Sequence, residues 1–324
     1  MTAGAPSKQY PRLRSAVGGS LNSLTVIGTQ AQFYAKTLVS IKDAFVHYRT
    51  EMVRLIAQMS LSTGALALIG GTVAVVGFLT LSVGSLVGIQ GYNQFSSFGT
   101  EALTGFASAY FVTRLLAPVI AGIALAATIG AGATAQLGAM RINEEIDALE
   151  VIGIRSIAYL ASNRVVAGVI VVIPLYCVAM LTAYFSARFT TTYVYGQSTG
   201  VYDHYFHTFL NPTDLIWSFF QAIVMAIVIM MVHTYYGFTA SGGPAGVGEA
   251  VGRSVRTSLI AAVFYGFYVL PLWLAISAGA CAAILSTVYS IRALTAHLPM
   301  DRIPPFARRL ALRFSLVPGS GRVN

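Results

Sequence analysis

Residues 141–154, RINEEIDALEVIGI, place four carboxylates between two long apolar runs, and this pattern indicates the architecture of the chain. The uncharged run before it covers Leu115–Met140, and the uncharged run after it covers Val165–Ala187. Each run is long enough for the roughly 20 residues that cross about 30 Å of hydrocarbon. The acidic segment is therefore predicted to be a short helix that connects two membrane spans.

The acidic segment is amphipathic when it is drawn as a helix. Ile142, Ile146 and Leu149 occupy positions i, i+4 and i+7 and so lie on one stripe. The four carboxylates occupy the other sides of the helix: Glu144, Glu145, Asp147 and Glu150. We expect the apolar face to pack against the membrane domain and the acidic face to meet a soluble partner.

The composition also favours a membrane protein. Hydrophobic residues make up 56 % of the chain and charged residues only 10 %, whereas a soluble domain carries about 25 % charged residues. The net charge of +9 arises from basic residues at the ends and beside the apolar runs. That distribution is typical of membrane orientation signals rather than of a nucleic-acid surface. Cys177 and Cys281 each lie inside an apolar run, so no disulfide framework is expected.

Five apolar stretches are predicted to cross the membrane. They cover Leu66–Ile89, Glu101–Met140, Val165–Ala187, Leu215–Tyr235 and Thr257–Ile291. The last stretch has 35 residues and would be about 52 Å long as a helix, which is too long for one upright span. Because proline removes a helical hydrogen bond, Pro271 is expected to divide it.

The basic residues predict which connections face the cytoplasm. The N-terminal 54 residues contain seven Lys or Arg, and the loops Arg141–Arg164 and Arg253–Arg256 are also basic, so the positive-inside rule places all three inside. The connections 90–100 and Phe189–Asp214 contain neither Lys nor Arg and are placed outside. Five spans would put the C-terminus outside, whereas the six Arg beyond residue 290 favour the inside, so the side of this tail stays open.

The chain is expected to divide into four segments of different character. These are a flexible N-terminus (1–21), an amphipathic helix (22–53), a transmembrane domain (54–291) and a basic tail (292–324). The helix has apolar residues at alternating steps of four and three: Tyr34, Leu38, Ile41, Phe45, Tyr48 and Met52. It is predicted either to lie on the cytoplasmic membrane surface or to pack with its apolar face against the bundle.

Few polar residues in or beside the spans are candidates for a functional site. Arg114 lies within the second span, where an ionisable residue is a functional hypothesis by default. The simpler alternatives are snorkelling toward the outer boundary or an ion pair with Glu101, about three turns away. Asp203, His204 and His207 have metal-binding side chains, but two of them are sequence neighbours that cannot share a helix face. A solvated loop is therefore favoured over a metal site there.

A nucleotide-binding site is not expected in this chain. A phosphate loop of the form G-x-x-x-x-G-K-[ST] needs a lysine directly after a glycine. The only lysines, Lys8, Lys36 and Lys42, do not follow one. The glycine-rich stretch 237–252 is interpreted as tight turns and close helix packing rather than as a phosphate cradle.

Two groups of residues resemble the MlaE/YrbE permeases, the integral-membrane subunits of lipid-transporting ABC systems that work with MCE-domain proteins. The first group is Arg114, Pro118, Gly130, Leu137–Met140, Glu144–Leu149, Gly153 and Ile154. The second is Gly237, Phe238, Gly242, Gly243, Gly246, Val247, Gly248, Val251, Val255 and Ser258. The resemblance covers roughly residues 25–262, and its most specific part is the E-E-I-D-A-L core.

This resemblance implies an all-α integral membrane protein of the plasma membrane, with an N-terminal interfacial helix, about five spans and a cytoplasmic coupling helix. The coupling helix is implied to dock on a separate ABC ATPase dimer, which binds the ATP and Mg²⁺, so this chain holds no cofactor or metal and is not an enzyme. Its site residues would be Arg141, Glu144, Glu145, Asp147, Leu149 and Glu150. The cytoplasmic glycine-rich block would comprise Gly242, Gly243, Gly246, Gly248 and Glu249.

The chain departs from the family pattern inside the second span. The pattern commonly has an acidic residue, an arginine and a glutamate where this chain has Leu115, Thr128 and Gln136. The intramembrane polar set is thus Arg114, Thr128 and Gln136. Since actinobacterial MCE operons usually encode two such permeases, the departures favour a heterodimer whose partner retains the missing charges.

The predicted function is that of a permease subunit in an ATP-driven transporter of a fatty acid, sterol or phospholipid, working as an importer with MCE proteins on the outer face. The alternative is a non-transporting membrane scaffold that anchors the MCE proteins and the ATPase. An ion-coupled secondary transporter would show inverted repeats and midplane carboxylates, and an intramembrane enzyme would show a convergent nucleophile or metal set. The sequence displays neither pattern.

Overall fold

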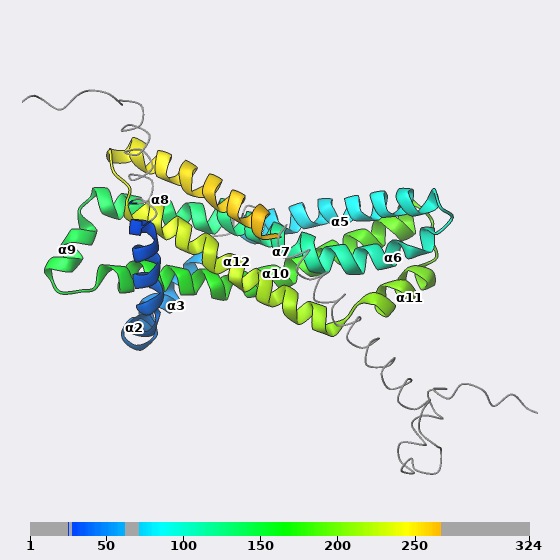
Figure 1. Cartoon of the computed structure of the whole chain (residues 1–324), viewed down its shortest axis with the longest axis horizontal. Helices are drawn as coiled ribbons and strands as arrows, with labels where there is room; N and C mark the ends of the chain where they lie inside the picture. The colour runs from blue at the N-terminus through cyan, green and yellow to red at the C-terminus, as the bar shows by residue number, and fades with distance from the viewer. Residues whose placement is uncertain (1–24, 26–27, 62–70, 267–324) are drawn as a thin grey trace, which may run out of the picture. The chain divides into compact units, whose positions relative to one another are not determined.

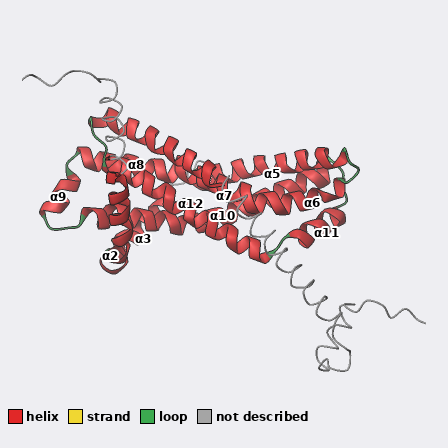
Figure 2. Cartoon of the chain, viewed as in Figure 1, coloured by secondary structure: helices red, strands yellow, loops and turns green. Residues whose placement is uncertain are grey.

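The computed structural model describes residue 25 and residues 28–61 and 71–266, and these residues are helices joined by short connections (Figure 2). The described part contains no strand, which confirms an all-α protein. The predictions for the flexible N-terminus, for the division at Pro271 and for the basic tail 292–324 lie outside the described residues.

Within the described residues, four helices are long and apolar enough to cross a membrane. They are α5 (Thr72–Ser96), the helix Glu101–Ile142, the helix Ile157–Val194 and α12 (Pro212–Phe238). They run alongside one another in Figure 1. The first four predicted spans are therefore confirmed, and the helices extend beyond most of the predicted limits.

The two longest helices combine α-helical parts with wider π-helical segments, and the second span begins with a tighter 3₁₀ turn. The second span consists of η1 (Glu101–Leu103), α6 (Thr104–Ala107), η2 (Ser108–Leu116), α7 (Ala117–Leu125), η3 (Ala126–Gly130) and α8 (Ala131–Ile142). The third consists of η4 (Ile157–Ser162), α10 (Asn163–Phe189) and η5 (Thr190–Val194). The π-helical segment η2 ends just before Pro118, whose ring nitrogen cannot donate to a preceding carbonyl.

The helix α10 lies at the centre of the bundle and packs against α5, α12, α7 and α3. Its contact with α5 is close because small residues face each other: a Cβ atom at Gly84 would overlap the carbonyl oxygen of Ala183. Hydroxyl pairs flank this point, with 2.6 Å between the Oγ atoms of Ser85 and Ser186. Small residues and hydroxyls of this kind allow helices in a membrane to approach closely.

Replacing Gly84 with valine is expected to destabilise the chain by about 1–3 kcal/mol, because the new side chain meets backbone that cannot move away. The matched control is Gly77→Val in the same helix, since a Cβ atom there has nothing within 4 Å. The melting temperature of each purified variant in detergent checks the prediction. Equal shifts for the two variants would contradict the α5–α10 contact.

The N-terminal amphipathic region is not the single helix predicted over residues 22–53. Residues 28–39 are helical, and α2 (Ile41–His47) and α3 (Arg49–Leu61) follow, with breaks at Ser40 and Tyr48. The buried side chains are also different from the predicted stripe, which was wrong for Leu38 and Phe45, both more than 40 % exposed. The buried ones are Phe33, Thr37, Ala44, Met52 and Leu55.

Contacts with the bundle explain these breaks. Phe33 packs edge-on against Tyr235 at 5.5 Å between ring centroids, and the Oγ of Ser162 donates to the carbonyl of Thr37 at 2.8 Å. Each short helix thus packs a different set of residues against the bundle. One continuous helix would bury a single stripe of residues instead. The interpretation of a core-facing helix therefore holds for the buried side, while the exposed apolar side stays available to a membrane surface.

Three segments that were predicted as loops are partly or wholly helical in the structure. The connection Arg141–Arg164 holds α9 (Glu145–Val151), as predicted, but its last residues belong to η4 and α10, so that Arg164 is buried. The predicted solvated loop around Asp203 is instead α11 (Thr199–Phe209). The segment Arg253–Arg256, also predicted as a loop, lies within a helix over residues 243–266. Pro244 lies in the first turn of that helix, where proline is favoured. The basic residues Arg253 and Arg256 can be part of a helix as long as they lie outside the apolar layer.

Candidate functional site

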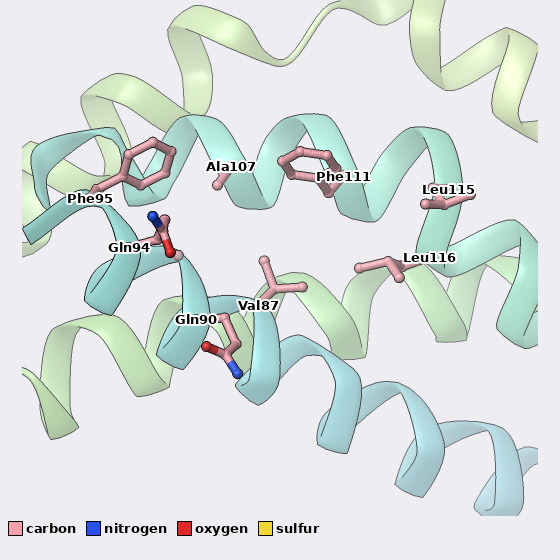
Figure 3. Close-up of a pocket in the computed structure, with 9 residues that line it drawn as sticks. Val87, Gln90, Gln94, Phe95, Ala107, Phe111, Leu115 and Leu116 are labelled. Atoms are coloured by element: carbon pink, nitrogen blue, oxygen red, sulfur yellow. The ribbon is translucent and has the colours of Figure 1, made fainter. Parts of the chain in front are cut away.

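A groove of about 350 Å³ lies between α5 and the facing part of the second span. Figure 3 shows Val87, Gln90 and Gln94 on α5 opposite Phe111 and Leu115. Among the described residues, the two glutamines are the only polar side chains that line it. The groove suits an elongated apolar ligand with a small polar end, because apolar walls with few polar groups are typical of small-molecule sites.

Leu115, one of the departures from the family pattern, lines the groove. At this position the pattern commonly has an acidic residue, whereas here a leucine forms part of the groove wall. The neighbouring Arg114 does not line the groove. The wall is accordingly more apolar than the family pattern implies.

Arg114 is paired with Asp214 in the first turn of α12. The two side chains are only 14 % and 12 % exposed, and the guanidinium lies 4.0 Å from the centroid of the Tyr110 ring. The alternative of a pair with Glu101 was therefore wrong. Because both groups are largely buried, loss of either one would leave the other charge poorly compensated.

Sequence reasoning missed Asp214, although a local signal was present. The segment Asn211-Pro212-Thr213-Asp214 begins α12: the side chain of Asn211 accepts from the backbone N–H of Thr213 at 3.0 Å, and Pro212 takes the first helical position. An acidic residue in the first turn of a span beside an intramembrane arginine is a candidate partner. Only the packing of α12 against η2 brings these two residues together.

Thr128 and Gln136 do not join Arg114 in one site. The hydroxyl of Thr128 donates to the carbonyl of Ala124 at 2.6 Å within its own helix, and Gln136 is exposed. From Arg114 to Gln136 the helix rises by about 33 Å. The three predicted polar positions are therefore spread along the span rather than gathered in a cluster.

The helix α9 is held to the bundle by its apolar face, as predicted. Ile146 is fully buried and lies in a cluster with Leu137 and Leu160, against which Leu149 also packs. Arg141, at the end of α8, forms an ion pair of 2.6 Å with Asp147. These contacts fix the orientation of α9 relative to the second span.

The other face of α9 is open. Glu144, Glu145 and Asp147 are exposed, and Glu144 has a left-handed backbone with φ of 58°. At the C-terminal end of α9, two apolar side chains are also exposed: Val151 is 87 % exposed and Ile152 is 70 % exposed. Exposed carboxylates beside an exposed apolar tip form a surface suited to a protein partner. Figure 1 shows α9 and α11 at opposite ends of the bundle.

The glycine-rich block forms a tight turn followed by close packing. Gly242 and Gly243 have φ of 91° and 73°, which other residues adopt rarely. A Cβ atom at Gly246 would overlap the carbonyl oxygen of Ser241, whereas one at Gly248 would meet nothing. Glu249 is exposed and paired with Arg253 in the same helix. The block thus has the geometry expected of a turn.

His233 belongs to a buried polar junction rather than to an open site. Its Nδ1 lies 2.8 Å from the hydroxyl of Thr134, which is 3.2 Å from the hydroxyl of Ser254. A Cβ atom at Gly130 would lie 2.5 Å from the imidazole ring. The junction connects α8, α12 and the helix over residues 243–266.

Asp203 is engaged by Arg188, whose Nε and Nη2 each donate to it at 2.8 Å. Across the described residues, no group of three or more His, Cys, Asp or Glu side chains has a metal-binding arrangement. Asp203, His204 and His207 lie on α11, where the first and third are one turn apart and the second points elsewhere.

The four apolar helices of the described part, with a short exposed acidic helix between the second and third, define a multi-pass α-helical membrane protein. The family model described as Permease MlaE matches residues 61–271, about two thirds of the chain. The chain therefore belongs to the MlaE permease family, and it is a multi-pass protein of the plasma membrane.

Proteins with related sequences agree with this assignment. A Rickettsia bellii protein named "Probable ABC transporter permease protein" is 28 % identical over 254 residues, which are 78 % of this chain and 98 % of the relative. The Arabidopsis thaliana protein named "Protein TRIGALACTOSYLDIACYLGLYCEROL 1, chloroplastic" is 30 % identical over 188 residues, 58 % of this chain and 53 % of the relative. A Synechocystis "Probable ABC transporter permease protein slr1045" is 27 % identical over 186 residues, 57 % of this chain and 71 % of the relative.

Proposed function

We propose that this chain is the membrane-spanning permease subunit of an ATP-driven lipid importer, with a fatty acid, sterol or phospholipid as its substrate. The observation that carries the proposal is the groove of about 350 Å³ between α5 and the second span. Its apolar walls match an acyl chain or a sterol ring system, and Gln90 and Gln94 match a polar end. The name of the Arabidopsis relative, which contains that of a galactolipid, supports a lipid class of substrate.

In this proposal the energy comes from a separate ABC ATPase dimer, which binds ATP and Mg²⁺, and this chain is not an enzyme. The exposed face of α9 receives the ATPase through Glu144, Glu145 and Asp147. Because Ile146 is buried against the second span, movement of α9 is transmitted to the helix that forms one wall of the groove. Glu150 and Arg141 act by holding α9, through bonds to Ser156 and Asp147 respectively. The glycine-rich block forms the cytoplasmic turn after α12.

A second MlaE-type permease is the proposed partner within the membrane, and MCE-domain proteins are the proposed partners on the outer face. Support for the second permease comes from one exposed side of the second span, where Ala127, Gly132, Gln136 and Ala139 leave small side chains and one amide uncovered. Small residues permit close helix association in a membrane. Nucleic acid is not among the proposed partners.

Gln90→Trp is expected to fill the groove and to lower cellular uptake of a fluorescent fatty acid at least tenfold, the factor that corresponds to about 1.4 kcal/mol. Asn93→Trp is the matched control, because Asn93 is exposed on the same helix but does not line the groove. Uptake is measured in cells that lack the native gene and express each variant at equal level. Equal uptake by both variants would exclude the groove as the lipid path.

The scaffold alternative predicts a different outcome. If the chain only anchors the MCE proteins and the ATPase, the Gln90→Trp and Asn93→Trp variants would support equal uptake. Deletion of the whole chain would still abolish assembly of the complex. Affinity purification in mild detergent, followed by mass spectrometry of the bound proteins and lipids, tests assembly in the same strains. Both alternatives predict recovery of the ATPase and the MCE proteins, whereas a lipid recovered with the complex supports the importer.

A further inference from the structure

A second cavity, of about 320 Å³, lies between α10 and α11 and shares no lining residue with the groove. It is lined by Tyr184, Phe185, Arg188, Tyr202, Asp203, Phe206 and His207. Most of these side chains are aromatic, and one cation and one carboxylate lie among them. Since Arg188 directly follows the predicted span Val165–Ala187, the cavity sits at the outer boundary of the apolar layer.

The aromatic walls of this cavity are fixed by contacts behind them. The hydroxyl of Tyr202 lies 2.6 Å from that of Ser108, and the hydroxyl of Tyr184 is bonded to Thr113. Phe206 packs edge-on against Tyr184 with 5.0 Å between ring centroids. A Cβ atom at Gly105 would lie 2.5 Å from the carbonyl oxygen of Tyr202, so α11 approaches the second span closely. A site held in this way loses little conformational freedom when a ligand binds.

The two charges in the cavity are oriented and accessible. Arg188 donates from Nε and Nη2 to the two carboxylate oxygens of Asp203, both at 2.8 Å. Their side chains are 46 % and 36 % exposed. The hydrogen bonds from Arg188 lower the pKa of Asp203 below its usual value, so that this carboxyl stays ionised at neutral pH. A guanidinium has five N–H groups, and within the described part of the chain Nη1 of Arg188 makes no hydrogen bond.

Arg188 is also isolated in the sequence. No other Lys or Arg occurs between Arg164 and Arg253, and within the described part of the spans Arg114 is buried against Asp214. Among the described residues at the outer end, Arg188 is therefore the exposed guanidinium that a lipid phosphate meets. Arginine is well suited to it because its N–H groups match the geometry of phosphate oxygens.

We propose that the cavity between α10 and α11 binds the headgroup of a zwitterionic phospholipid from the outer leaflet. The phosphate lies on Arg188, and the ammonium group lies beside Asp203 and the tyrosine rings, since aromatic faces attract cations. The exposed stack of Phe185, Phe189 and Tyr193, with ring centroids 6.2 Å and 5.0 Å apart, receives the first carbons of the acyl chains. This site is separate from the groove and does not depend on transport.

The proposal is tested by native mass spectrometry of the purified full-length chain, titrated in detergent with dioleoylphosphatidylethanolamine. Arg188→Gln is expected to weaken binding at least tenfold. The matched control is Arg155→Gln, because Arg155 is also exposed, precedes the other end of the same span, and is paired with Asp43 at 2.8 Å. Dioleoylglycerol, which lacks both charges, is expected not to bind. Equal phosphatidylethanolamine binding by the two variants would overturn the proposal.

Two further variants test the role of each charge and the location of the lipid. Asp203→Asn is expected to retain phospholipid binding but to lose the preference for phosphatidylethanolamine over phosphatidylglycerol, because the partner of the ammonium group is removed. Gln90→Trp is expected to leave the binding that Arg188→Gln weakens unchanged, whereas loss of that binding would place this lipid in the groove instead. Where Arg188→Gln does not fold, as judged by its melting temperature, Arg188→Lys replaces it: weakened binding supports the proposal, and unchanged binding overturns it.

Discussion

Replacing Asp214 with asparagine is expected to lower the free energy of unfolding by about 3–5 kcal/mol, the cost of leaving one member of a buried ion pair without its partner. The side chain of Arg114 is only 14 % exposed, so its guanidinium would stay largely buried in the variant. The cation–π contact with Tyr110 remains but compensates only part of the charge. Unfolding of the purified chain in mixed micelles of increasing denaturing detergent measures the change.

The control for this prediction is Glu101→Gln, which removes the carboxylate that the sequence had suggested as the partner of Arg114. We expect a change within about 0.5 kcal/mol, as for substitutions that break no buried contact. The double variant Arg114→Met/Asp214→Leu is expected to recover most of the stability, because two apolar side chains replace the pair without leaving a buried charge. An equal loss in Asp214→Asn and Glu101→Gln would show that the buried pair does not form.

Reversing the charges of Glu144 and Asp147 to lysine is expected to abolish co-purification of the ATPase while membrane insertion is unchanged. Asp147 is exposed on α9 and Glu144 is exposed at its N-cap, and a reversed charge that meets a like charge on the partner costs several kcal/mol. The buried face of α9 is untouched by these substitutions, since Ile146 and Leu149 hold the helix to the bundle. The amount of ATPase recovered per amount of tagged chain, from membranes that contain both, is the measurement.

The matched control for the coupling helix is Glu249→Lys. Glu249 is an exposed carboxylate paired with an arginine of its own region, as Asp147 is paired with Arg141. It lies in the helix over residues 243–266 rather than on α9. Full ATPase recovery with this control and none with the double reversal supports the proposed role of α9. Unchanged recovery with the double reversal would refute that role.

Several features could be predicted because they depend on local composition alone. A charge-free run of about 20 residues has one stable position in a bilayer, and it must be helical there because its backbone groups have no water to bond. The first four spans follow from this rule, as does the short amphipathic helix around Ile146. Their ends were less accurate, since a helix extends past the apolar layer wherever nothing breaks it, as it does through Arg253 and Arg256.

Other features depend on contacts between distant residues and were not predicted. The breaks at Ser40 and Tyr48 arise because each short helix packs against a different part of the bundle. The pair of Arg114 and Asp214 joins residues 100 positions apart. The groove has its walls on two helices, so neither helix alone indicates it.

Local sequence was sufficient to predict an all-α membrane protein with an acidic helix between its second and third spans, and its motifs resemble those of the MlaE family. The physical reason is that hydropathy and charge act locally, and a bilayer converts them directly into depth and orientation. The side chains that meet became known only from the packed bundle: Asp214 with Arg114, Arg188 with Asp203, and the lining of the two cavities. These pairings depend on how the side chains of neighbouring apolar helices pack together. The spacing of residues along one helix does not indicate which residues of another helix they will contact.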